Sequence, residues 1–280
     1  MKTAVVTGAA GAIGSAVCGQ LINRGYQVLA VDVVGLGGLP SGVTPVHADL
    51  TDPRFYLRVL EAVNSAGERC DLLVNNAGIV LTGPLEAVDP DMMRREQQVN
   101  LQAPMLLTWA LFPLLRQARG HVVSVASLAS MLPLAESPGY CASKAGLRAF
   151  MLALSLRQKE TGVHISLVHP GAVDTPMLRH EAANGGSALN FLSAPLAPEV
   201  VANAVVANLD RPCLETSLPR IDGPLVKLVG LSPAVLQRIR PLLERRAASG
   251  AAKYRRDNGI ESPRPFDRSP STSPTQERKP

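Results

Sequence analysis

The sequence is poor in the residues that mark disulfide-bonded, metal-binding and membrane-spanning proteins. Aromatic residues make up only 4% of its 280 residues, and the cysteines, at positions 18, 70, 141 and 213, form no CxxC pair and no His/Cys cluster. This pattern predicts free thiols in a reducing compartment, with neither disulfides nor a metal site. The most apolar stretch, residues 101–115, contains two prolines and is shorter than the roughly 20 residues that a membrane-spanning helix needs. We therefore expect a buried helix there.

The amino-terminal segment and the charge distribution argue against a secreted protein and against a nucleic-acid-binding protein. Residues 1–17 imitate a signal peptide, but Gly8, Gly11 and Gly14 interrupt the apolar run, and we expect a cytoplasmic protein. The formal net charge is +5, and nine Lys and Arg against five Asp and Glu lie from position 244 onward, so most of this charge belongs to the tail. Because the body is close to neutral, we expect no nucleic-acid partner.

Apolar residues alternate between strand-like runs and helical spacing along the chain. Strands are predicted at residues 3–7, 27–31, 43–47, 71–75, 120–126, 163–168 and 215–218, and helices at 12–24, 53–66, 89–115, 140–161 and 198–209. This alternation predicts a parallel sheet covered by helices on both faces, with ligands at the carboxyl ends of the strands. We predict an α/β fold, a Rossmann-type doubly wound parallel sheet in a single domain over residues 1–220.

A glycine-rich turn, TGAAGAIG at residues 7–14, joins the first strand to the first helix. Small residues in such a turn let backbone N–H groups approach a pyrophosphate at the helix N-terminus. Asp32 follows the second strand, where a carboxylate accepts hydrogen bonds from the ribose of NAD and repels the 2′-phosphate of NADP. Glycines also make ordinary turns, but the strand, the helix and Asp32 together favour dinucleotide binding, with NAD preferred over NADP.

Ser127, Tyr140 and Lys144 form a pattern that is typical of hydride-transfer chemistry. If a helix begins near Tyr140, Lys144 lies at position i+4 on the same face. The charge of a lysine held there lowers the pKa of a phenol from its unperturbed value of ~10 toward working pH. A tyrosine and a lysine at this spacing also occur by chance on helix surfaces, so the pattern gains its weight from Ser127 and Asn100.

With these motifs in this order, the chain resembles the short-chain dehydrogenase/reductase family over roughly residues 1–220. The matching motifs are TGAAGAIG, Asp32, ADL at 48–50, NNAG at 75–78, Asn100, Ser127, YCASK at 140–144 and HPGAVDTPM at 169–177. The resemblance implies that Ser127, Tyr140 and Lys144 are catalytic and that Asn100 holds a water in the proton relay. It implies cofactor contacts from Tyr140 and Lys144 and from Gly8, Ala12, Ile13, Gly14, Asp32, Asp49, Leu50, Asn76, Ala77, Gly78, Pro170, Gly171, Val173 and Thr175.

The chain departs from the family pattern at three places. Its glycine loop reads GxxGxxG, with Ala12 at the usual middle glycine, which resembles the extended branch of the family; the catalytic spacing and the HPG segment fit the smaller, dehydrogenase-type branch better. The strand before Ser127 reads SVAS where the family often has NxSS, and the chain continues past the usual end. Two alternatives stay open, because Asp49 and Asn100 are also suited to capping helices.

Residues 176–195 stand where this family carries a mobile substrate lid. Apolar residues there and upstream predict an apolar pocket, with substrate contacts from Ser127, Leu132, Tyr140 and Met177. We predict hydride transfer between NAD and the CH–OH group of a hydrophobic secondary alcohol, such as a steroid-, retinoid- or lipid-like alcohol. The alternatives are an NADPH-dependent ketoreductase and a non-catalytic dinucleotide-binding regulator.

The carboxyl-terminal part of the chain predicts a helical extension over residues 221–249, with amphipathic helices at 225–231 and 233–246. Its basic residues fit a flap over the substrate, peripheral contact with an anionic membrane, or a solvated helix face. Residues 250–280 are rich in Pro, Ser and Arg and are predicted to be disordered. The resemblance also implies a homodimer or homotetramer that pairs the helices beginning near Asn100 and Tyr140.

Overall fold

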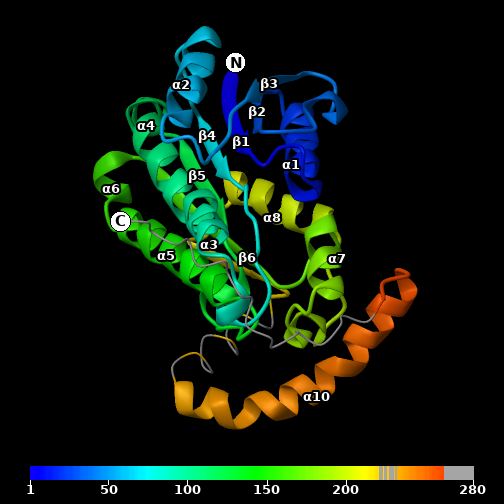
Figure 1. The fold of residues 1–280 in the computed structure, drawn as a ribbon. Helices are drawn as coiled ribbons and strands as arrows, with labels where there is room; N and C mark the ends of the chain where they lie inside the picture. Colours follow the sequence, from blue (N-terminus) through cyan, green and yellow to red (C-terminus); the bar gives the residue numbers. More distant parts are fainter. Residues whose placement is uncertain (221–222, 224–225, 227–229, 231, 262–280) are drawn as a thin grey trace, which may run out of the picture.

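Seven parallel strands form one sheet in the computed structural model, which describes residues 1–220, 223, 226, 230 and 232–261 (Figure 1). From one edge to the other, the strand order is β3-β2-β1-β4-β5-β6-β7. The bounds are β1 (Lys2–Thr7), β2 (Tyr26–Asp32), β3 (Val43–His47), β4 (Leu72–Asn75), β5 (His121–Val125), β6 (His164–Pro170) and β7 (Glu215–Leu218). The order reverses between β1 and β4, which opens a ligand crevice at the carboxyl ends of these two strands. The predicted Rossmann-type doubly wound sheet is confirmed.

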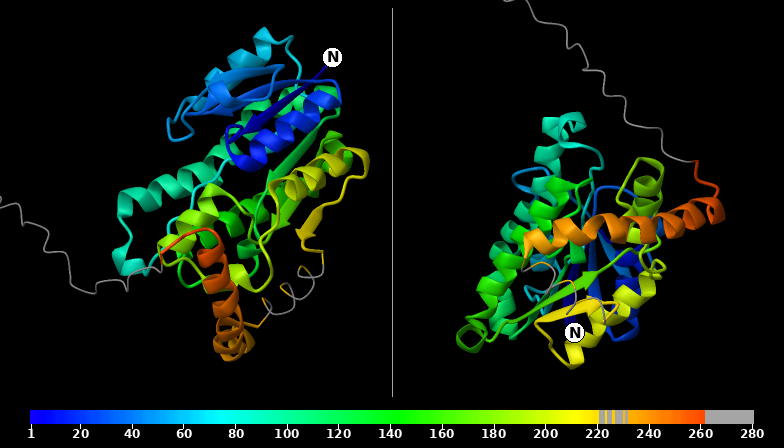
Figure 2. Two further views of the ribbon diagram at one scale, coloured as in Figure 1. Left: turned by 90° about the vertical axis from the view of Figure 1, so that its right-hand side faces the viewer. Right: turned by 90° about the horizontal axis from the view of Figure 1, so that it is seen from below.

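Helices cover both faces of the sheet, as Figures 1 and 2 show. One core lies between the sheet and α2 (Phe55–Ser65), α4 (Ala103–Ala118) and α5 (Pro138–Ser155). The other lies between the sheet and α1 (Ala12–Asn23) and α8 (Pro198–Asp210). Neighbouring strand residues such as Ala4 and Val5 belong to opposite cores. The strands are therefore apolar along most of their length, which explains why the sequence shows continuous runs rather than alternation.

Two predicted helices differ in detail from the structure. The predicted helix over 89–115 consists of α3 (Pro90–Gln97), a π-helix η3 (Gln98–Gln102) and α4, which ends only at Ala118. The predicted helix over 140–161 begins earlier, at Pro138, because proline suits the first helical position. It ends at Ser155, and a separate short helix α6 (Gln158–Thr161) follows. Shorter 3₁₀ segments are η1 (Leu36–Gly38), η2 (Leu85–Ala87) and η4 (Leu128–Ser130).

The predicted lid forms α7 (Pro176–Ala183) and η5 (Ala188–Phe191), and a long helix, α10 (Pro233–Asp257), packs against both. Figures 1 and 2 show α10 crossing the molecule beyond the carboxyl ends of the strands. The prediction that disorder begins at residue 250 is wrong as far as Asp257. Gly250 lets α10 approach closely, since a Cβ there would lie 2.3 Å from the carbonyl oxygen of Phe191. The ring of Tyr254 then packs against Phe191, with centroids 5.0 Å apart.

Several predictions concern residues that the structure does not describe. Most of the predicted helix over 225–231, and the tail from residue 262 onward, lie outside the described residues. Among the residues that are described, no helix combines the length and apolar character needed to cross a membrane.

Candidate active site

The glycine loop between β1 and α1 allows an unusually close approach of backbone to backbone. Gly8 has φ +65°, and a Cβ on Gly14 would lie only 2.1 Å from the carbonyl oxygen of Gly8. Ala12 and Ile13 open α1 directly after this loop, and no side chain caps the helix. The first N–H groups of α1 therefore face the crevice at the carboxyl end of β1, an arrangement that favours an anionic group such as a phosphate.

Asp32 lies beside this loop at the end of β2. Its carboxylate accepts the backbone N–H of Ala10 at 2.9 Å and that of Val33 at 2.7 Å. Neither Val33 nor Val34 offers a positive charge to a 2′-phosphate. The position fits the predicted ribose contact, because ribose hydroxyls find acceptors there and a second anion meets repulsion.

Asp49 does not cap a helix, which removes one of the alternatives. Its carboxylate accepts the backbone N–H of Thr51 at 2.9 Å and the Thr51 hydroxyl at 2.8 Å, while α2 begins only at Phe55. The hydrogen bonds from Thr51 hold the pKa of Asp49 below its usual range. Asp49 and the neighbouring Leu50 thus lie in a tight turn after β3, where the predicted adenine contact remains a prediction.

The segment after β4 fastens the glycine loop to the centre of the sheet. Asn76 donates from Nδ2 to the carbonyl oxygens of Thr7 and Gly8, at 3.0 and 3.1 Å. The Thr7 hydroxyl in turn accepts the backbone N–H groups of Asn76 and Ala77, both at 3.1 Å. Asn76 and Gly78 also line the large cavity described below. The predicted cofactor residues from β1 and β4 therefore meet at one point.

Asn100 is fully buried in the π-helix η3 and is not a helix cap. Its Oδ1 accepts the backbone N–H of Ile79 at 2.9 Å, and its Nδ2 donates to the Ile79 carbonyl at 2.8 Å and to the Ser143 hydroxyl at 3.1 Å. The side chain thereby connects the segment after β4 with α5, the helix that carries Tyr140 and Lys144. π-Helices of this kind often occur at functional sites. The water-holding role of Asn100 remains a prediction.

Ser127, Tyr140 and Lys144 line one cavity, as the sequence predicts. Ser127 follows β5, and its Oγ accepts the backbone N–H of Ala129 at 3.1 Å. Tyr140 and Lys144 lie one turn apart on α5, with the lysine Nζ 5.8 Å from the centre of the tyrosine ring. Lys144 Nζ donates to the carbonyl oxygen of Val125 at 3.1 Å, so the charge is fixed at the carboxyl end of β5.

The electrostatics of this set differ from the sequence-based expectation. Burial raises the pKa of Tyr140 above its ordinary value, and the carboxyl group of Glu181 raises it further, whereas a hydrogen bond with Ser127 lowers it. Burial lowers the pKa of Lys144 to about 8, and the nearby carboxyl group of Glu96 opposes this shift. The net shift of the Tyr140 pKa is therefore upward, opposite to the lowering predicted from Lys144, because burial is its largest cause.

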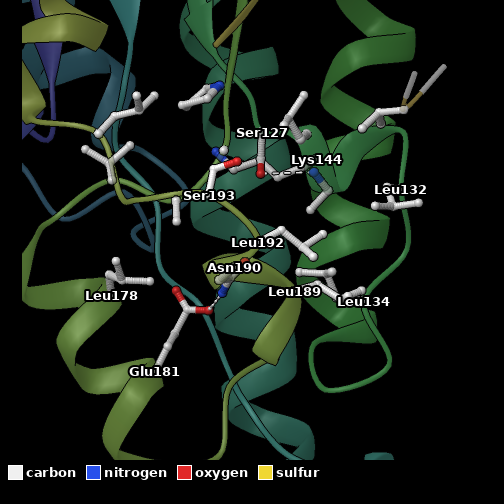
Figure 3. Close-up of a pocket in the computed structure, with 18 of the residues that line it drawn as sticks. Ser127, Leu132, Leu134, Lys144, Leu178, Glu181, Leu189, Asn190, Leu192 and Ser193 are labelled. Atoms are coloured by element: carbon white, nitrogen blue, oxygen red, sulfur yellow. Dashed lines mark hydrogen bonds between the residues drawn. The ribbon is translucent and has the colours of Figure 1, made fainter. Parts of the chain in front are cut away.

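The cavity in front of these residues has a volume of about 570 Å³ and extends to the lid (Figure 3). Leu132 and Met177 line it, as predicted, and so do Ile13, Pro170, Gly171, Val173 and Thr175. Thr175 also caps α7 by accepting the backbone N–H of Leu178 at 3.3 Å. The other walls of the cavity are largely apolar, and α10 closes the cavity with Ile239, Leu243 and Arg246.

Two carboxyl groups near this set are not predicted from the sequence. Glu181 of the lid helix lines the cavity. It lies on the same helix face as Met177 and Leu178, and this spacing can be read from the sequence. Glu96 on α3 is only 1% exposed and lies beside α5, and no pattern in the sequence marks it. Within the described part of the chain, no group of three His, Cys, Asp or Glu side chains is placed to hold a metal ion.

The structure combines a Rossmann-type sheet, a glycine loop with an acidic residue after β2, and a Ser–Tyr–Lys set in one cavity. These features define a protein with a dinucleotide-binding fold and a candidate hydride-transfer site. A family model described as short chain dehydrogenase matches residues 2–185. The chain belongs to the short-chain dehydrogenase/reductase family.

Relatives within this family carry oxidoreductase names. The chain is 35% identical to retinol dehydrogenase 5 of Mus musculus over 214 residues, covering 73% of this chain and 66% of that protein. It is 35% identical to 1-deoxy-11-beta-hydroxypentalenate dehydrogenase of Streptomyces exfoliatus over 199 residues, 66% of this chain and 72% of that one. The chain thus spans just under two thirds of the retinol dehydrogenase.

A solved structure shares the fold. The 3-ketoacyl-(acyl-carrier-protein) reductase from Brucella melitensis, complexed with NADH, superposes with a TM-score of 0.67 at 24% identity. The superposition covers 78% of this chain and 98% of that protein.

Proposed function

We propose that the protein is an NAD-dependent oxidoreductase that interconverts a hydrophobic secondary alcohol and its ketone. The observation that carries this proposal is the convergence of Ser127, Tyr140 and Lys144 on one largely apolar cavity. The oxidoreductase names of the relatives and the NADH complex of the structural neighbour support it. A non-catalytic regulator would need the fold but not this convergence.

The residues of the chain divide the chemistry among them. Ser127 donates a hydrogen bond to the substrate oxygen, and Tyr140 removes the hydroxyl proton as a general base. NAD, held by the glycine loop and Asp32, would supply the acceptor for the hydride that leaves the carbinol carbon. Lys144 holds a positive charge one helical turn from Tyr140 and stabilises the phenolate that accepts the proton. The proton then passes to solvent, and the alcohol becomes a ketone.

Ketone reduction with NADPH is the second candidate. Burial raises the pKa of Tyr140, and the protonated tyrosine is the form that donates a proton to a carbonyl oxygen. The position of Asp32 argues for NAD instead, because a carboxylate beside the loop repels the extra phosphate of NADPH. The choice of cofactor therefore separates the two candidates.

The test measures NAD reduction across a panel of secondary alcohols, with Tyr140→Phe as the catalytic control. We expect wild-type turnover on apolar members and a loss of about a thousandfold in the variant. Activity that survives Tyr140→Phe contradicts the mechanism.

A second measurement compares the binding of NAD and NADPH to the wild type, Asp32→Ala and Asp52→Ala. Asp52 is an exposed aspartate that serves as the matched control. We expect weaker NAD binding only in Asp32→Ala. Unchanged NAD affinity in that variant would favour the NADPH-dependent ketoreductase.

We also propose a homo-oligomer in a reducing, cytoplasmic environment. On α4, Trp109 is 67% exposed and Met105 and Leu106 are 38% exposed, which is the kind of apolar surface that a second copy covers. All the cysteines are free thiols, as a reducing compartment maintains them. Analytical ultracentrifugation of the wild type and Trp109→Glu tests the assembly, with a lower oligomeric state expected in the variant.

For α10 we propose two faces with different roles. Ile239 and Leu243 point to the cavity and support the flap interpretation. The solvent-exposed side of α10 carries Leu242 together with basic side chains, at positions 238, 245, 253 and 256, and supports peripheral contact with anionic membrane. Equal partitioning of the wild type and Leu242→Glu with anionic liposomes would argue against the membrane contact.

A further inference from the structure

The lid end of the cavity contains a carboxyl group among apolar walls. Glu181 lies on α7 on the same face as Met177 and Leu178, and Figure 3 shows its side chain turned toward the cavity at the end far from Ser127 and Lys144. The walls between the two ends carry apolar side chains, among them Leu134, Leu189 and Leu192. A substrate that fills the cavity therefore meets polar groups at both ends.

Glu181 has a neutral hydrogen-bond partner on the other half of the lid. Asn190 of η5 donates from Nδ2 to Glu181 Oε2 at 3.0 Å. No salt bridge involves Glu181 among residues 1–220 and 232–261. Because a carboxyl group has acceptor sites for more than one donor, one hydrogen bond leaves capacity that a ligand can use. Burial raises the pKa of Glu181 to about 7.

We propose that Glu181 and Asn190 form a second polar subsite, which binds a hydroxyl group at the end of the substrate remote from the reacting carbinol. The proposal rests on the proposed function, since it assigns the reacting carbinol to Ser127 and Tyr140. It narrows the substrate class from an apolar alcohol to an amphipathic one with two oxygen functions separated by an apolar body.

A hydroxyl group matches this subsite better than other polar groups do. It donates to a carboxylate and accepts from a protonated carboxyl group, so it fits both forms of Glu181. A substrate carboxylate meets repulsion, and a purely apolar substrate leaves a buried carboxyl group without water or a replacement donor. An ammonium group fits only the ionised form of Glu181.

The experiment uses pairs of secondary alcohols that differ only in a distal hydroxyl, with apolar spacers of increasing length. Turnover with NAD is measured for the wild type, Glu181→Gln and Glu181→Leu. Glu136→Gln is the matched control, because it makes the same chemical change in a carboxylate that pairs with Arg240 outside the cavity lining.

At the best spacing we expect the wild type to prefer the hydroxylated alcohol by about 10- to 100-fold in kcat/KM, since a hydrogen bond to an ionisable group has this effect. Glu181→Leu should remove the preference, read as the ratio of kcat/KM for the two members of a pair, because the effect of Glu181 on the pKa of Tyr140 acts on both alcohols alike. Glu181→Gln keeps an acceptor and should retain part of the preference, and Glu136→Gln should retain all of it.

Three results would overturn the subsite. The first is a wild type without preference at any spacing. The second is a Glu181→Leu variant that keeps the wild-type ratio between the two alcohols, as expected if Glu181 only joins α7 to η5. The third is tighter binding of a distal ammonium than of the hydroxyl. Calorimetric binding of the same pairs needs no turnover. A wild type that oxidises neither alcohol but binds the hydroxylated one more tightly would refute the proposed function and support the subsite.

Discussion

Replacing Lys144 with methionine should stabilise the folded chain at neutral pH while it abolishes turnover. Lys144 is only 3% exposed, and its pKa falls from 10.5 to about 8 because burial disfavours the charged form. At about 1.4 kcal/mol per pH unit, this shift corresponds to about 3 kcal/mol of destabilisation below pH 8. Methionine keeps most of the apolar contacts of the side chain. It loses the hydrogen bond to Val125, worth about 1 kcal/mol, so the expected net gain is about 2 kcal/mol at pH 7.

The pH dependence of the stability difference provides a second, independent test of this prediction. Between pH 8 and 10.5, the unfolded chain binds a proton at Lys144 that the folded chain has released, so the stability of the wild type rises with pH across this window. Lys144→Met lacks this contribution, whereas other groups titrate alike in both proteins. The advantage of the variant should therefore shrink to near zero by about pH 10.

Urea unfolding at pH 7 and pH 10 measures the free energy of unfolding for both tests. Lys159, an exposed lysine on α6, provides the control, and Lys159→Met should change the free energy of unfolding by less than about 0.5 kcal/mol at either pH. A Lys144→Met variant that is less stable than the wild type at pH 7 would refute the reasoning. So would a stability difference that is the same at both pH values.

Three further predictions follow from individual contacts. Gly14→Ala should destabilise the chain by about 1–3 kcal/mol in urea unfolding and abolish NAD binding in a fluorescence titration, because its Cβ would lie 2.1 Å from the Gly8 carbonyl oxygen. Tyr254→Phe should lower the free energy of unfolding by about 1 kcal/mol, since the hydroxyl donates to Asp174 at 2.7 Å and the ring contact survives. Burial lowers the pKa of His121 to about 4. Up to about 3 kcal/mol of stability is therefore lost as the pH falls from about 6.5 toward 4, because the unfolded chain binds a proton there that the buried histidine does not. Acid unfolding of His121→Gln should therefore be less steep than that of the wild type.

The fold and the central site were predictable because they depend on local patterns. Strands buried on both faces appear as continuous apolar runs, and the switch to helical spacing after each run fixes the layers. The motif spacings placed Ser127 at the end of a strand and Tyr140 and Lys144 on the helix that follows, and the structure brings all three to one cavity. The end of α10 was not predictable, since the contact between Tyr254 and Phe191 that extends it joins residues far apart in the chain.

The prediction for the pKa of Tyr140 was wrong for a similar reason, because this pKa depends on residues that are far apart in the chain. The sequence shows that a lysine stands one turn from Tyr140, and a single pair of charges then predicts a lowered phenol pKa. The structure adds burial of both groups and two carboxyl groups, Glu96 and Glu181, that come from other elements. Burial raises the pKa of the tyrosine and lowers that of the lysine, so it disfavours the charged form of each side chain. For the Tyr140 phenolate to form, the charge on Lys144 must persist, and Glu96 is the group that opposes its loss. Glu96, a buried acid that no motif contains, thus favours the charged form of Lys144.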